Sequence, residues 1–126
     1  MAVNKKHEEF HAIDMSGGWE RPDGYPPGIE QKILSGRLDG ARRQGSLTRF
    51  LRFAPGAFTK APVVHDYWEE VYLVSGNLIV GNDAQGKGGE SFKSNTYACR
   101  PPGVVHGPFK SETGCLLLEI HYYDPP

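Results

Sequence analysis

Hydrophobic residues are gathered in short runs along the chain, and turn-forming residues separate the runs. The runs are rich in β-branched, aromatic and leucine side chains, and each has the length of a β-strand. They comprise residues 31–34, 47–53, 71–74, 78–80, 97–99 and 116–123. Gly, Pro, Asn and Asp lie between them, as in strands joined by tight turns. The pattern predicts an all-β domain, either a sandwich or a small barrel, and leaves residues 39–44 as the only plausible helical fragment.

Residues 1–30 differ from the rest of the chain because they are polar and rich in turn residues. Glycine and proline interrupt them repeatedly, for example at Gly17 and Gly18. Such a segment can lie across a scaffold but has too few apolar residues to build a core of its own. We therefore predict an extended N-terminal arm over residues 1–30 and a β-barrel over residues 31–126.

Composition supports this fold class. Of 126 residues, 16 are glycine and 10 are proline, and neither is well tolerated inside a helix. A helix bundle is therefore disfavoured, whereas these residues suit turns between strands. The chain length and a hydrophobic fraction of 38% fit one compact domain.

The charge balance narrows the class of partner. The chain has 14 basic and 15 acidic residues, so no long-range field would attract nucleic acid or an anionic membrane. We expect a small-molecule partner instead. Residues 1–10 lack the apolar stretch of a secretory signal, and no run is long and apolar enough to span a membrane. We therefore expect a cytoplasmic protein in which Cys99 and Cys115 are free thiols.

Two segments, residues 62–76 and 100–109, place histidines and a carboxylate beside tight turns. Through them the chain resembles the cupins, whose two motifs are G-x5-H-x-H-x3,4-E-x6-G and G-x5-P-x-G-x2-H-x3-N. The resemblance extends over residues 45–123. It implies a cupin fold for this chain, which is a jelly-roll barrel, also called a double-stranded β-helix.

The spacing of the first segment decides which residues correspond to the motif. If His65 is the second histidine, three residues separate it from Glu69 and six more separate Glu69 from Gly76, so both intervals match. Val63 then occupies the position of the first histidine. The alternative register, with His65 first and Tyr67 second, fits neither interval, and we prefer the first.

The second segment matches the motif at Pro101, Gly103 and His106. Asn95 stands where the opening glycine would be, and Lys110 stands where the closing asparagine would be. The resemblance is therefore closer for the fold than for the site.

The resemblance implies a metal site formed by His65, Glu69 and His106. Two imidazoles and one carboxylate suit non-haem Fe(II), which we favour, and Mn, Ni or Zn would also accept them. Four residues of straight strand span about 13 Å, so residues 66–68 must turn a corner if His65 and Glu69 share an ion. The turn at residues 101–103 would bring His106 to the same interior.

A different interpretation of His65 and Glu69 is a hydrogen-bonded polar pair at a strand corner. Val63 argues against a metal, because it removes one of the four ligands that the family usually supplies. We expect His121, on a late strand, to be a structural or rim residue.

The arginines have a simpler expected role. We expect Arg49, Arg52 and Arg100 to be solvated surface charges, although one of them could hold a substrate carboxylate at the barrel mouth.

Two classes of function follow from the resemblance. The first is a metal-dependent, dioxygenase-like enzyme that acts on a small organic substrate, with Glu69 as both metal ligand and catalytic proton acceptor. The second is a sensor of the type found in ChrR anti-sigma factors, because residues 97–107 look like that subgroup. Fold alone does not choose between enzyme and sensor. We also expect a homodimer in which the arm crosses to the partner's sheet edge.

Overall fold

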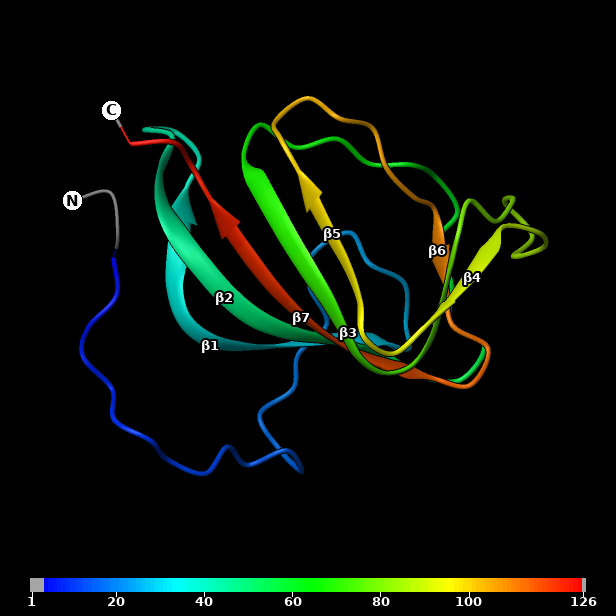
Figure 1. The fold of residues 1–126 in the computed structure, drawn as a ribbon, viewed down its shortest axis with the longest axis horizontal. Coiled ribbons are helices and arrows are strands. Elements are labelled where there is room, and N and C mark those ends of the chain that lie inside the picture. Colours follow the sequence, from blue (N-terminus) through cyan, green and yellow to red (C-terminus); the bar gives the residue numbers. More distant parts are fainter. Residues whose placement is uncertain (1–3, 126) are drawn as a thin grey trace.

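The computed structural model describes residues 4–125, and these residues form an all-β barrel without a helix (Figure 1). The strands are β1 (Ile29–Asp39), β2 (Gln44–Phe53), β3 (Trp68–Val80), β4 (Glu90–Lys93), β5 (Thr96–Arg100), β6 (Phe109–Lys110) and β7 (Cys115–Tyr122). The predicted all-β jelly-roll fold is confirmed. Among these residues the structure has no helix that could cross a membrane.

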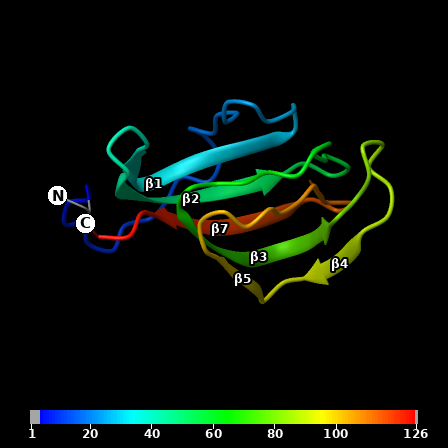
Figure 2. The same ribbon diagram turned by 90° about the horizontal axis from the view of Figure 1, so that it is seen from above.

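Every strand pair is antiparallel, and β3 joins the two halves of the barrel. Strands β1, β2, β7, β3 and β5 lie side by side in one curved layer (Figure 2). The first half of β3 pairs with β5, and its second half pairs with β4 and β6. The change of partners follows a bend at Gly76, whose φ of 82° favours glycine.

The inward faces of β2, β7 and β3 change from apolar to polar along the strands. One cross-strand row consists of Leu51, Leu117 and Leu73, all deeply buried. The next row is Arg49, Glu119 and Val71, and the one after it contains His121 and Glu69. These four polar residues are buried as well. The core therefore fills one end of the layer, and a buried polar cluster lies at the other.

Residues 39–44 do not form a helix. Asp39 and Gln44 are the last pair of the β1–β2 ladder, and the residues between them form its hairpin turn. Arg43 has a φ of 53° there, a conformation used in turns and not in α-helices. The strands on either side override the local helical tendency.

The arm lies along β1 of its own chain. The side-chain amide of Asn4 donates from its nitrogen to the carbonyl oxygen of Arg37 and accepts at its oxygen from the N–H of Arg37. The backbone of Glu20 pairs with that of Gln31. The contacts place much of the arm against the edge strand of the barrel. Strand β1 begins at Ile29, next to the predicted boundary.

Candidate metal centre

His65 and Glu69 reach the barrel interior from either side of a corner. His65 precedes β3, a bend follows at Asp66 and Tyr67, and β3 begins at Trp68 with Glu69 next. The corner that the spacing required is present. Its position is held by a hydrogen bond of 2.8 Å in which the backbone N–H of Gly103 donates to the carbonyl oxygen of His65.

His106 arrives from the loop between β5 and β6. That loop turns at Pro102 and Gly103, where Gly103 has a φ of 86°. His106 then pairs with Val63 through two backbone hydrogen bonds of 2.8 and 2.9 Å. The residue in the position of the missing motif histidine thus holds the backbone of His106 in place.

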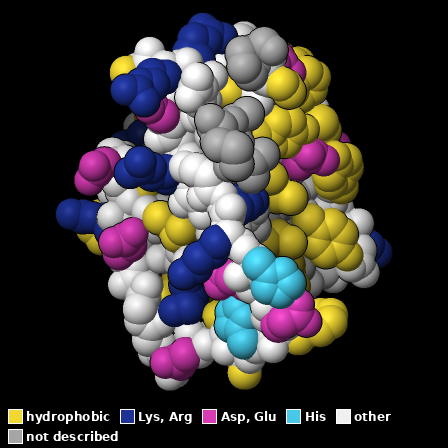
Figure 3. All heavy atoms as spheres, turned by 90° about the vertical axis from the view of Figure 1, so that its left-hand side faces the viewer, with side chains coloured by type: hydrophobic (Ala, Val, Ile, Leu, Met, Phe, Trp, Pro, Cys, Tyr) yellow, Lys and Arg dark blue, Asp and Glu magenta, His cyan; other side chains and the backbone are white. Residues whose placement is uncertain are grey.

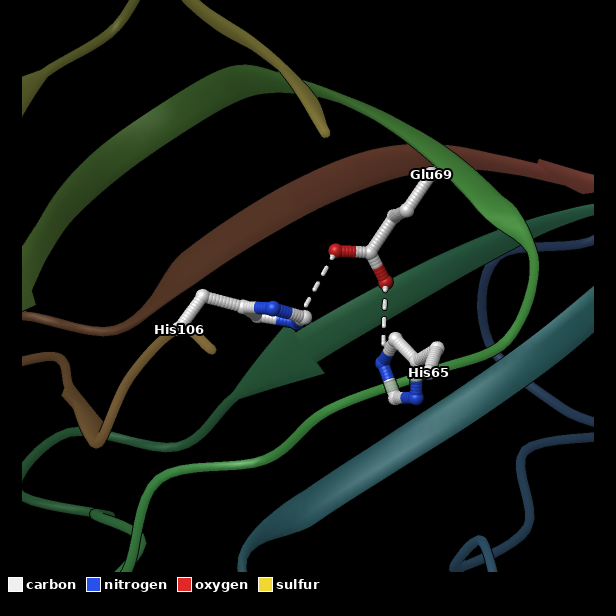
Figure 4. A group of neighbouring side chains, drawn as sticks. All are labelled: His65, Glu69 and His106. Atoms are coloured by element: carbon white, nitrogen blue, oxygen red, sulfur yellow. Dashed lines mark ion pairs between the residues drawn. The ribbon is translucent and has the colours of Figure 1, made fainter. Parts of the chain in front are cut away.

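The three predicted ligands come together around Glu69 (Figure 4). The Nε2 atom of His65 is 3.7 Å from Oε2 of Glu69, and Nε2 of His106 is 3.4 Å from Oε1. One ligand atom from each residue lies within 4.8 Å of the others. Ligands about 2.1 Å from one ion lie up to about 4.2 Å apart, so small side-chain movements would be enough to coordinate a metal.

The hydrogen bond of the His106 ring fits a metal ligand. Its Nδ1 lies 3.1 Å from the carbonyl oxygen of Val104. Because a carbonyl oxygen only accepts, Nδ1 is the donor, and a neutral His106 directs the lone pair of Nε2 at the carboxylate of Glu69. Two acceptors that face each other are stabilised by a cation between them. Burial also lowers the pKa of His65, which favours the neutral form needed for coordination.

Two arginines that were expected to be solvated belong to the site. Arg100 donates from Nη1 to Oε1 of Glu69 over 2.9 Å. Arg49 is 6% exposed and donates to Oε1 of Glu119 from Nε and Nη2 over 3.0 and 2.8 Å. Arg52 alone of the three is half-exposed and pairs with Glu30 near the surface. The expectation is therefore wrong for Arg49 and Arg100, because buried carboxylates supply their partners.

His121 lies inside the site and not at the rim. It is 3% exposed, and its Nε2 is 3.0 Å from Oε2 of Glu69 and 3.1 Å from Oε1 of Glu119. Sequence reasoning gave His121 only a structural or rim role, and it did not single out Glu119. A signal was available, because both alternate with Leu117 along β7 and so share its inward face.

The charges around His121 act on one another. Burial lowers the pKa of His121, but hydrogen bonds to Glu119 and Glu69 outweigh burial and raise the pKa above its ordinary value. Burial raises the pKa of Glu119, but Arg49 and His121 together lower the pKa well below its usual range. Glu119 is therefore ionised at neutral pH.

A cleft of about 1090 Å³ opens onto this cluster. His65, Tyr67, His121 and Arg49 line it, and Tyr25 of the arm contributes to its wall. The ring of Tyr67 stacks on that of His65 at 4.5 Å between centroids. Of the predicted ligands, His65 lines this cleft, and Glu69 and His106 line a neighbouring cavity of about 40 Å³ that His65 also lines.

A jelly-roll barrel with histidines and a glutamate converging at this position is a cupin. Residues 19–123 match the family described as the ChrR cupin-like domain. The chain belongs to that family, as the resemblance of residues 97–107 suggested. No curated protein matches it.

Solved structures show the same fold at low sequence identity. An RmlC-like cupin from Shewanella frigidimarina is 19% identical, with a TM-score of 0.66, and the match covers 97% of this chain and 96% of that one. KdgF from a Halomonas species is 19% identical, with a TM-score of 0.64 and coverage of 90% and 94%. An acetylacetone dioxygenase from Acinetobacter johnsonii is 20% identical, with a TM-score of 0.63 and coverage of 98% and 80%.

Proposed function

We propose that the chain is a metal-binding cupin that acts as a dioxygenase-like enzyme on a small organic substrate. The observation that carries the proposal is the convergence of His65, Glu69 and His106 in the barrel interior, with His65 also lining a cleft that opens beside them. Two imidazoles and a carboxylate are the donor set of many non-haem Fe(II) centres, and Fe(II) is the metal that we favour. Mn, Ni or Zn would fit the same donors.

The bound metal would supply Lewis acidity and, as Fe(II), redox chemistry with dioxygen. The protein's own residues would bind the metal, accept a proton and exclude water. His65 and His106 hold the cation, and Glu69 is both a ligand and the group that accepts a proton from an enolisable substrate at a carboxylate oxygen. Leu51 and Leu117 close the barrel beneath the site and exclude water from it.

The buried charges indicate an uncharged substrate. The buried guanidinium of Arg49 is paired with Glu119, and the partly buried guanidinium of Arg100 is paired with Glu69, so each already has a carboxylate partner. A substrate carboxylate would have to break one of these pairs. A neutral ketone or diketone has no such cost, and the acetylacetone dioxygenase with the same fold makes acetylacetone a reasonable first substrate to test.

Metal analysis tests the proposal most directly. Protein purified without chelators should contain about one transition metal per chain, and His106→Ala should lose it because a ligand is gone. His11→Ala is the matched control, since His11 lies exposed on the arm. The Fe(II)-loaded protein should consume dioxygen when acetylacetone is added. If no loading condition gives bound metal, the proposal fails.

The family match also favours a second function, that of a sensor. A cupin domain of the ChrR type could bind the same metal in the cleft and report its presence to another protein. Measuring the turnover of a diketone or an aromatic ketone distinguishes the two functions. A sensor would bind metal through the same residues but would turn over no diketone or aromatic ketone.

A further inference from the structure

Four buried side chains form a continuous series of hydrogen bonds and ion pairs that ends on the proposed ligand Glu69. Arg49 donates to Glu119 over 2.8 and 3.0 Å. His121 lies between the two carboxylates, with Nε2 3.1 Å from Oε1 of Glu119 and 3.0 Å from Oε2 of Glu69. We propose that His121, held by Glu119 and Arg49, is a positioning residue that fixes the carboxylate of Glu69 for metal binding. This inference rests on the proposed function of Glu69 as a ligand.

The hydrogen on His121 is located by its neighbours. Ionised carboxylates only accept hydrogen bonds, and both groups near Nε2 are carboxylate oxygens. Nε2 must therefore carry a hydrogen and donate it. A nitrogen that donates has no lone pair left for a metal, so through Nε2, the atom that faces Glu69, His121 acts on the metal by way of Glu69 and not as a ligand.

The distances alone would also allow a second ion among Glu69, Glu119 and His121, because their ligand atoms lie within 4.8 Å. The charges argue against it. The guanidinium of Arg49 lies 2.8 Å from the same Oε1 atom of Glu119 that faces His121. A cation there would meet an arginine already paired with its carboxylate. Hydrogen bonds and ion pairs among the four side chains therefore complete the cluster without an ion.

Glu69 is held at both of its oxygens. Arg100 donates to Oε1 over 2.9 Å, and His121 lies 3.0 Å from Oε2. Two contacts from opposite sides fix the rotation of a carboxylate, which one contact would leave free. Hydrogen-bond partners of this kind orient metal ligands, and their loss typically weakens metal binding by about 10- to 100-fold.

The strands provide a rigid base for this arrangement. Glu69 and His121 are directly paired across β3 and β7, and Arg49 and Glu119 are directly paired across β2 and β7. Their side chains meet because the strand register sets them opposite each other on the inward face. Positions on strands hold a site more closely than positions on loops, and His65 and His106 are both on loops.

The test measures Co(II) affinity by competition with a chelator, together with the visible spectrum of bound Co(II). His121→Phe removes the donor, and we expect affinity to fall by about tenfold or more and the spectrum to change. His121→Gln keeps a donating N–H, and we expect affinity to stay within about threefold of the original. Leu116→Ala is the control, because it truncates a side chain on the opposite face of the same strand, away from Glu69. If His121→Phe changes neither the Co(II) affinity nor the visible spectrum of bound Co(II), the proposal is wrong.

A second measurement needs no metal. Urea unfolding of the metal-free protein, with His121→Phe, Glu69→Gln and the double variant, gives the coupling between the two side chains. We expect the change in the unfolding equilibrium constant of the double variant to differ by about tenfold from the product of the two single changes. Independent effects would overturn the positioning role. If the unaltered protein binds no Co(II) but the coupling is found, the proposed metal function fails and the contact between His121 and Glu69 stands.

Discussion

The ion pair between Arg49 and Glu119 has both its members buried, and this sets the cost of breaking it. Both side chains are less than a tenth exposed. Glu119→Gln would leave the guanidinium of Arg49 buried without a counter-charge, and we predict a loss of about 3 to 5 kcal/mol in the free energy of unfolding. Urea unfolding of the metal-free protein measures this loss.

A surface pair in the same chain provides the control. Arg52 and Glu30 are 2.9 Å apart, and their side chains are 38% and 41% exposed. Glu30→Gln should cost less than about 1 kcal/mol because water replaces the lost partner. Equal losses for Glu30→Gln and Glu119→Gln would contradict the assigned importance of burial.

The same pair predicts how stability changes in acid. The pKa of Glu119 is lowered from 4.5 to about 2, since Arg49 and His121 outweigh the opposing effect of burial. A lowered pKa stabilises the folded protein above the unfolded value, and this stabilisation is lost as the pH falls from about 4.5 towards about 2. Unfolding measured over that range should show the gap between the original protein and Glu119→Gln narrowing. A gap that stays constant would contradict the lowered pKa.

The site residues that could be predicted are those fixed by spacing along the chain. His65, Glu69 and His106 were assigned from intervals within two short segments, and the structure brings them together. His121 and Glu119 come from a strand far away in sequence, so only the pairing of β7 with β3 and β2 places them there. Their inward direction was predictable from the alternation along β7, whereas their neighbours were not.

At the scale of elements, the bend of β3 at Gly76 links the two halves of the barrel. A Cβ atom at Gly76 would lie 1.9 Å from the backbone oxygen of Gly114 and 2.8 Å from the Cα of Cys115. Backbone atoms of a paired strand cannot move aside cheaply. We predict that Gly76→Ala lowers the free energy of unfolding by more than about 3 kcal/mol.

A substitution at Gly81 is the control that separates the cost of steric crowding at Gly76 from the cost of its backbone conformation. Its φ is 89°, close to the 82° of Gly76, but a Cβ atom there would meet nothing within 4 Å. Gly81→Ala should therefore cost about 1 to 2 kcal/mol, the usual cost of a left-handed conformation. Equal losses in urea unfolding would show that contact with Gly114 is unimportant.

The strands could be predicted because their apolar runs are separated by clear turn signals. The run at residues 47–53 lies within β2, and the run at residues 116–123 overlaps almost all of β7. The long β3 was less visible, because Ser75 and Gly76 divide it into two apparent runs. Those residues mark the bend of one continuous strand, which pairs with different neighbours on either side.

At the scale of the whole molecule, metal binding should stabilise the fold. The proposed ligands come from β3, from the loop before it and from the loop after β5, so they converge only when the barrel is folded. Metal at about 100 times its dissociation constant would add about 2.7 kcal/mol, or about 10 °C in melting temperature for a chain of this size. Thermal unfolding with and without a chelator measures the shift. His106→Ala should show no shift, and an equal shift in that variant would place the metal elsewhere.

The outer face of the barrel layer carries a continuous apolar row. Phe50, Leu118, Tyr72 and Tyr97 are successive cross-strand partners on β2, β7, β3 and β5. The two tyrosines are 38% and 58% exposed. Apolar side chains also gather along one side of the surface in Figure 3, while charged side chains are spread over the rest. An exposed apolar surface of this kind is typical of a protein interface.

We predict that this face pairs with the same face of a second copy, which gives a two-fold homodimer. The arm lies on its own chain, at the β1 edge and over the outer face beside it, where Lys5 donates to Thr48 and the ring of Trp19 lies 3.9 Å from the guanidinium of Arg52. The exposed tyrosines of β3 and β5 are therefore the part of this face that a second copy would cover. Leu118→Glu would place a charge in the centre of the interface and should convert the dimer to a monomer in light scattering. Lys93→Glu, on exposed β4, should leave the dimer intact. A monomer before any substitution, or a dimer that survives Leu118→Glu, would exclude this interface.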